Sequence, residues 1–186
     1  MKKITKKWLK KINACCPESD MDRAEKEFKG DVQLIVRALL GENRFDDANW
    51  LLTRIMNKSQ NVQYAIFAAE QVLSIFENKY PNDNRPRKAI EAAKNYLKNP
   101  CKKTKSAAYA TVYTTVYAAA NAATAAAYAT VYATVYADAN ADAAATAHAA
   151  HAAAYAAVAY TKKGLQTKIL EKGVEILKEK KWKYKN

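Results

Sequence analysis

The chain has few of the residues that bend or end regular structure, with only four Gly and four Pro among 186 residues. A β-rich fold would need more turn residues than this, so their scarcity favours helices. Cysteine is also rare: Cys15 and Cys16 are adjacent, and Cys101 lies far from both. An odd number of cysteines without regular spacing is not a disulfide framework and indicates a reducing compartment. No CxxC pair is present, so the cysteines do not predict a zinc site.

Lys, Arg and Glu are missing from residues 106–161, which also lack Gly, Pro and Leu and contain only two Asp. Alanine fills half of this stretch, and Tyr, Thr, Val and Asn supply most of the rest. Alanine has the highest helix propensity and a side chain small enough for helices to approach closely. We therefore expect closely packed helices with tyrosine rings between them. The stretch is too polar for a membrane span, which needs about 20 mainly apolar residues.

The same stretch contains an internal repeat. Residues 109–123 and 128–142 are identical at 12 of 15 positions, and each copy has tyrosines at four-residue intervals. As one helix, residues 106–161 would be about 84 Å long, at about 1.5 Å per residue. A compact chain of this length is only about 40 Å across. We therefore expect the segment to fold back at least once, with one protruding helix as the alternative.

Apolar residues recur at helical spacing along most of the remaining chain. A further helix is expected to start at Ser19 or Asp20 as N-cap, after Pro17. Ser59 is the expected cap of the clearest helix, and Gly164 is expected to end the helix that precedes the last one. The predicted helices cover residues 3–13, 31–40, 43–57, 59–80, about 86–98 and 165–182.

These patterns predict an all-α fold, a compact multi-helix bundle with closely packed Ala/Tyr-rich central helices. We expect an N-terminal basic helical region over residues 1–58. A helical domain over residues 59–186 follows, with the Ala-rich repeat at 106–161 and a basic C-terminal helix.

Positive charge is concentrated at the two ends of the chain. Residues 1–105 carry a net charge of +9 and residues 162–186 carry +6, whereas residues 106–161 carry −2. This distribution favours acidic partners, either an acidic protein face or nucleic acid, with a solvated lysine surface as the plain alternative. Association with an anionic membrane surface through the first and last helices is less favoured. The candidate binding lysines surround Trp8 in the first helix: Lys6, Lys7, Lys10 and Lys11.

His148 and His151 are the only histidines, three residues apart in the Ala-rich stretch. Histidine with a carboxylate on one helix face can bind a divalent metal. Asp142 lies six residues before His148, however, and this spacing does not put the two on one face. We therefore predict no metal site, and expect histidines that hydrogen-bond to tyrosines or to the backbone.

Arg85 and Arg87 flank Pro86 at the start of a predicted helix. Two guanidinium groups near a helix N-terminus could hold a carboxylate or a phosphate. The alternative is an intramolecular ion pair with Asp83 or Glu91. The sequence does not decide between them.

Motifs that would carry catalysis are missing from the chain. There is no phosphate-binding Gly-rich loop, no HExxH and no GxSxG. Neither Cys15 nor Cys16 has a histidine in its own segment to act as a base. We expect a protein that is not an enzyme and that needs no cofactor.

Three segments carry a family resemblance. Residues 63–77 resemble the opening helix of immunity proteins of the Imm-5 type, and residues 80–93 contain an RPRxAIEAA pattern that is the most distinctive match. Residues 145–156 are similar to a histidine-containing helix near the end of that family. The resemblance covers roughly residues 60–180, and the first 58 residues fall outside it.

The resemblance implies a bacterial protein that neutralises a polymorphic toxin by binding it. On this interpretation Arg85, Arg87, His148 and His151 form a structural or binding cluster. The expected partner is a toxin or defence component with an acidic face, and the expected location is the cytoplasm, with a homodimer as a further expectation. The alternative function is a basic helical protein that binds nucleic acid or a nucleoprotein complex, such as a phage or mobile-element counter-defence inhibitor.

Overall fold

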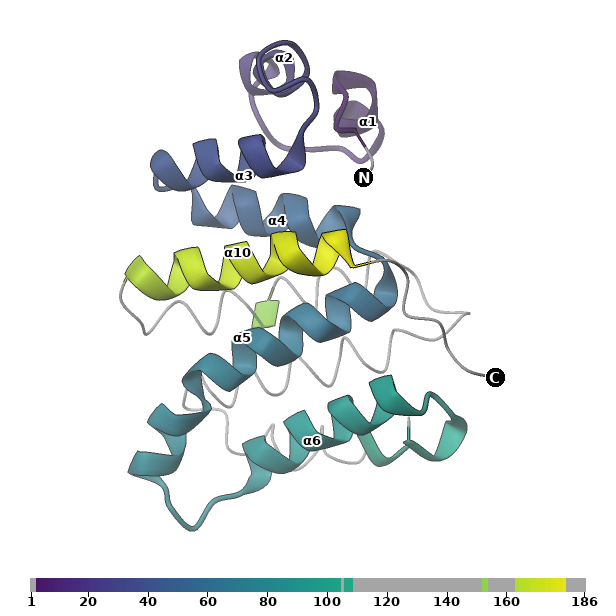
Figure 1. Ribbon diagram of the computed structural model, residues 1–186, viewed down its shortest axis with the longest axis vertical. Helices are drawn as coiled ribbons and strands as arrows, with labels where there is room; N and C mark the ends of the chain where they lie inside the picture. Colours follow the sequence, from purple (N-terminus) through teal and green to yellow (C-terminus); the bar gives the residue numbers. More distant parts are fainter. Residues whose placement is uncertain (1–2, 105, 109–151, 154–162, 180–186) are drawn as a thin grey trace. The chain divides into compact units, whose positions relative to one another are not determined.

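The computed structural model describes residues 3–104, 106–108, 152–153 and 163–179. Within these ranges the regular structure is helical and contains no strand, so the predicted all-α fold class is confirmed (Figure 1). Most of the Ala-rich repeat lies outside the described residues. The prediction of closely packed Ala/Tyr-rich helices concerns these residues. Of the few described residues of this repeat, Ala108 and Ala153 are fully buried, whereas Ser106, Ala107 and Ala152 are exposed. The helices are α1 (Lys6–Lys11), α2 (Glu18–Lys26), α3 (Val32–Gly41), α4 (Phe45–Ile55), α5 (Lys58–Lys79), α6 (Arg85–Lys98) and α10 (Lys163–Lys178).

The chain divides into two compact units, Met1–Ala48 and Asn49–Asn186, and the division falls inside α4. The sequence predicted a boundary after residue 58, at the start of α5. No helix in the described part of the chain is both long and apolar enough to cross a membrane.

In the first unit, the extended backbone before α1 approaches Gly30 closely. Ile4 is buried, and its backbone N–H donates to the carbonyl oxygen of Gly30 at 3.0 Å. Gly30 has φ of +71°, and a Cβ placed on it would lie 2.5 Å from the carbonyl oxygen of Ile4. Glycine is therefore required here both by the backbone conformation and by the space.

Ion pairs join the short helices of the first unit. Lys6 contacts Asp22 at 2.6 Å and Glu18 at 2.9 Å, which ties α1 to α2. Arg44 contacts Asp20 at 2.7 Å and Asp47 at 2.6 Å. Such partly exposed pairs each stabilise weakly, but together they orient helices that are too short to be stable alone.

The N-terminus of α5 is capped by a residue that the sequence interpretation missed. Asn57 accepts from the backbone N–H of Gln60 at 2.9 Å, and the Gln60 side chain accepts from the Asn57 N–H at 3.0 Å. This reciprocal capping box starts the helix one residue before Ser59. The prediction of Ser59 as the cap was therefore wrong, and its hydroxyl is buried with no hydrogen-bond partner among the described residues.

Two other predicted helix ends also differ. Helix α2 starts after Pro17, which has no side-chain cap, so neither Ser19 nor Asp20 is its N-cap. Gly164 lies inside α10 and does not end a preceding helix. In both places a helix runs through a residue that is also common at helix ends.

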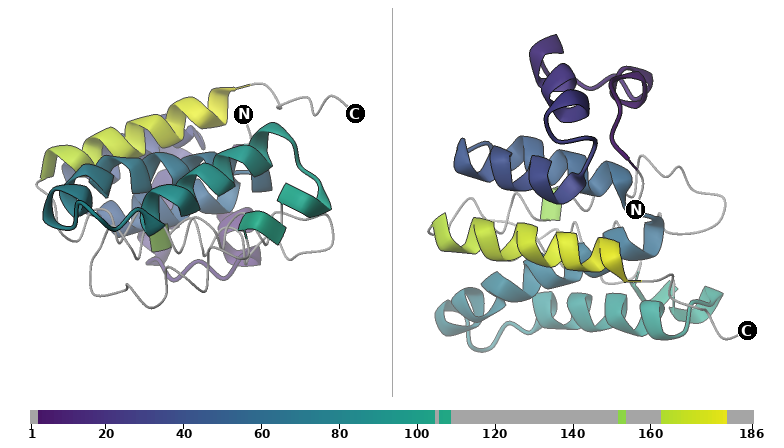
Figure 2. Two further views of the ribbon diagram at one scale, coloured as in Figure 1. Left: turned by 90° about the horizontal axis from the view of Figure 1, so that it is seen from below. Right: turned by 45° about the horizontal axis from the view of Figure 1, so that its top comes forward.

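In the second unit, α5 packs against α6 on one side and α10 on another, as Figures 1 and 2 show. Tyr64 of α5 is fully buried, and its hydroxyl donates to the side-chain oxygen of Asn49 at 3.0 Å. A Cβ on Gly173 would lie 2.9 Å from both Tyr64 and Leu52. This small residue lets α10 approach the core, and Gln60 adds a hydrogen bond to the Ile176 carbonyl at 2.9 Å.

Candidate functional site: the α5–α6 turn

The RPR motif lies where α5 turns into α6. Helix α5 ends because the chain reaches Pro81, after the backbone N–H of Tyr80 has bonded to the Phe76 carbonyl at 2.8 Å. The turn closes when the N–H of Asp83 donates to the Tyr80 carbonyl at 3.0 Å. Pro86 lies at the start of α6, where its missing N–H costs nothing.

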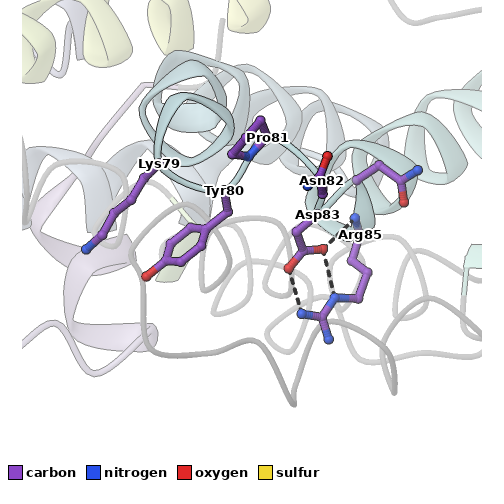
Figure 3. A pocket seen from close by; sticks show the side chains of 7 residues that line it. Lys79, Tyr80, Pro81, Asn82, Asp83 and Arg85 are labelled. Atoms are coloured by element: carbon purple, nitrogen blue, oxygen red, sulfur yellow. Dashed lines mark hydrogen bonds and ion pairs between the residues drawn. The ribbon is translucent and has the colours of Figure 1, made fainter.

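Arg85 is held by Asp83 within this turn (Figure 3). Its Nε donates to Oδ1 at 2.8 Å and its Nη2 to Oδ2 at 2.6 Å, while its backbone N–H also reaches Oδ1 at 3.1 Å. These bonds lower the pKa of the Asp83 carboxyl below its usual value. A planar guanidinium that meets a carboxylate along two parallel bonds fixes orientation as well as distance.

Arg87 forms a second bidentate pair, across the turn to α5. Its Nε and Nη2 each donate to a carboxylate oxygen of Glu77 at 2.6 Å. Both arginines are thus engaged within the chain, one of the two alternatives that the sequence left open. Asp83 was an expected partner, whereas Arg87 pairs with Glu77 and not with Glu91.

An aromatic group is exposed beside these ion pairs, because Tyr80, the C-cap of α5, is 39% exposed and lines the same hollow as Asp83 and Arg85. Ile75 is also exposed, but it lies on a different face of α5 from Glu77. The Tyr80 ring lies 5.0 Å from the ring of Phe76, and the ammonium of Lys79 lies 5.5 Å from the Tyr80 ring. Residues 79–85 line an open hollow of about 600 Å³. Exposed tyrosine and arginine on a fixed backbone are typical of the centre of protein interfaces.

We predict that Arg85→Gln will raise the pKa of Asp83 toward the usual value of about 3.9. The folded-state pKa is depressed, so the pair stabilises the turn above the unfolded pKa and is lost as pH falls through the folded one. An NMR titration of the Asp83 carboxyl carbon measures this. Arg87→Gln is the matched control and should leave the Asp83 titration unchanged. If Asp83 titrates alike in all three proteins, the ion pair does not form in solution.

The other predicted site residues are not brought to this turn. His148 and His151 lie outside the described residues. The four lysines of α1 belong to the first unit, and Arg85 and Arg87 belong to the second. Lys6 and Lys10 are paired with Glu18. Lys7 and Lys11 are exposed and have no carboxylate partner within the described ranges.

No group of His, Cys, Asp or Glu in the described part of the chain could hold a metal ion. Cys101 is exposed, and hydrogen bonds with Thr104 lower the pKa of its thiol. Cys16 differs, because burial raises the pKa of its thiol.

The regular structure of the described residues is therefore all helical, and ion pairs fix the partly apolar α5–α6 turn. The family model described as "Imm-5 like putative immunity protein" matches residues 51–186. The match covers most of the chain, so the protein belongs to this family. It includes α5, α6, α10 and part of α4, and it begins just inside the second unit. A search of curated proteins and a search of solved structures find no match.

Proposed function

We propose that the protein is an immunity protein that neutralises a toxin by binding it, without catalysis. Membership of the Imm-5-like family over residues 51–186 is the observation that carries the proposal. The expected location is the cytoplasm, where the toxin would act.

The α5–α6 turn supports a binding role for the second unit. Two bidentate ion pairs hold its backbone before any partner arrives, and a preformed surface loses less conformational entropy on binding. Tyr80 offers apolar area in the hollow beside these pairs. Arg85 and Arg87 would orient this surface, and His148 and His151 remain proposed members of the same cluster.

The partner surface that fits best is acidic. The chain carries a net charge of +13. Complementary charge speeds the encounter of two proteins and excludes partners of the wrong sign. An interface of standard size would bury roughly 800 Å² on each partner.

Co-expression in a bacterial host tests the proposal. On this proposal, the product of the adjacent gene should stop growth when expressed alone and permit growth when this protein is present. The two should also copurify. Tyr80→Glu should weaken copurification, and Ser74→Glu, at an exposed position of α5 outside the hollow, is the control for added charge. Unchanged growth arrest in the presence of the folded protein would refute the proposal.

A second candidate function, nucleic-acid binding, is favoured by the exposed lysines of α1. Lys7 and Lys11 lie four residues apart and so share one helix face. If they contact phosphates, Lys7→Glu/Lys11→Glu should weaken binding to duplex DNA, and affinity should fall steeply with salt. A gel-shift series at two salt concentrations measures both effects. Binding that is insensitive to salt, or unchanged in the variant, would exclude this surface.

A further inference from the structure

A groove with an apolar floor runs between α5, α6 and α10 in the second unit. Ile66 and Phe67 of α5, Leu97 of α6 and Ile176 of α10 form its floor. Phe67 is half-buried, whereas the other three side chains are almost fully buried. The groove has a volume of about 290 Å³. This is at the lower end of the range for small-molecule pockets, so it suits inserted side chains better than a large cofactor.

Some charged residues on the rim of the groove form ion pairs, whereas others have no described partner. Lys94 forms an ion pair with Glu70, and Lys172 forms one with Glu175 at 2.9 Å. Lys98, at the end of α6, is exposed and has no carboxylate partner within the described ranges. Glu179 is the one rim carboxylate without a described partner, and it lies at the α10 side.

The basic character continues beyond the rim on the α6 side. Lys102 and Lys103 follow α6 directly and are exposed, again without a carboxylate partner among the described residues. The α6 side of the groove therefore has positive charge that the described chain does not neutralise. An apolar trough with an unneutralised basic edge is complementary to a segment with an apolar face and an acidic edge.

We propose that this groove binds an acidic amphipathic helix of a partner protein. Apolar side chains of that helix enter the floor over Phe67, and its carboxylates contact Lys98 and Lys102. The inference rests on the proposed function, because it takes the partner to be a protein. A nucleic acid fits less well, since phosphates gain nothing from an apolar floor and leave it exposed to water.

The proposal can be tested on the full chain with two synthetic helical peptides. Both have leucine along one face, and the other positions carry Glu in one peptide and Lys in its counterpart. The Glu peptide should bind at least tenfold more tightly in fluorescence anisotropy. Lys98→Glu/Lys102→Glu should weaken its binding at least tenfold. Lys88→Glu/Lys168→Glu makes the same change of charge at exposed positions outside the groove and should change affinity less than twofold.

Phe67→Gln tests the floor separately from the charge, with circular dichroism to verify folding. This variant should also weaken binding of the Glu peptide several-fold. Equal effects of the two double variants, or no binding of the Glu peptide, would overturn the proposal. Displacement of the peptide by a single-stranded oligonucleotide would also overturn it, in favour of nucleic acid. If the toxin binds and the peptide does not, only the groove inference fails; if the peptide binds and the toxin does not, only the proposed function fails.

Discussion

Gly30→Ala is expected to destabilise the first unit by about 3 kcal/mol or more. A non-glycine residue at positive φ costs roughly 1–2 kcal/mol, and the new Cβ would also overlap the backbone of Ile4. That backbone cannot yield easily, because Ile4 is buried and bonded to Gly30 itself. Hydrogen exchange across residues 3–48 should therefore show loss of protection in this unit.

Gly41→Ala is the matched control for this prediction. Gly41 is helical, and a Cβ on it would meet no atom within 4 Å. Alanine there should stabilise α3 by up to about 1 kcal/mol, because it has the higher helix propensity. If both variants exchange like the parent protein, the contact between Ile4 and Gly30 is not part of the folded unit.

Tyr64→Ala is expected to destabilise the second unit by about 4 kcal/mol. Truncation of a fully buried aromatic side chain leaves a cavity that costs about 3–5 kcal/mol, and Tyr64 is 0% exposed. The change also removes the hydrogen bond to Asn49. Tyr64→Phe removes the hydroxyl alone and should cost about 1 kcal/mol. Urea unfolding monitored by circular dichroism measures both.

Tyr80→Ala, at a position 39% exposed, is the control and should cost far less than Tyr64→Ala. Burial raises the pKa of the Tyr64 phenol above its usual value, so the hydroxyl remains a donor over the whole working pH range. Equal destabilisation by Tyr64→Ala and Tyr80→Ala would contradict the buried position of Tyr64.

Local rules predicted most of the described helices. The apolar spacing of α3 and α5 and the Pro86 start of α6 follow from 3.6-residue periodicity and from proline geometry, which are properties of neighbouring residues. The cap of α5 was missed because Asn57 and Ser59 can both cap, and the choice depends on the reciprocal bond from Gln60. Only the folded structure shows which of these two candidates makes that bond.

The site was predictable only in part, for the same reason. Arg85 and Asp83 are two residues apart, so their pair could be anticipated. Glu77 meets Arg87 only because the turn brings α5 and α6 together, and no spacing rule reports that contact. The exposure of Ile75, by contrast, agrees with helical periodicity, because this residue lies outside the predicted apolar stripe of α5.

The central claim is neutralisation by binding, and stoichiometry tests it most directly. Increasing amounts of the purified protein are added to a fixed amount of the proposed toxin, taken to be the product of the adjacent gene, and the remaining toxin activity is measured. We expect activity to fall linearly and to vanish when an equimolar, or another fixed whole-number, ratio is reached. Full loss of activity at catalytic, substoichiometric amounts, or activity unchanged at excess, would contradict inhibition by occlusion.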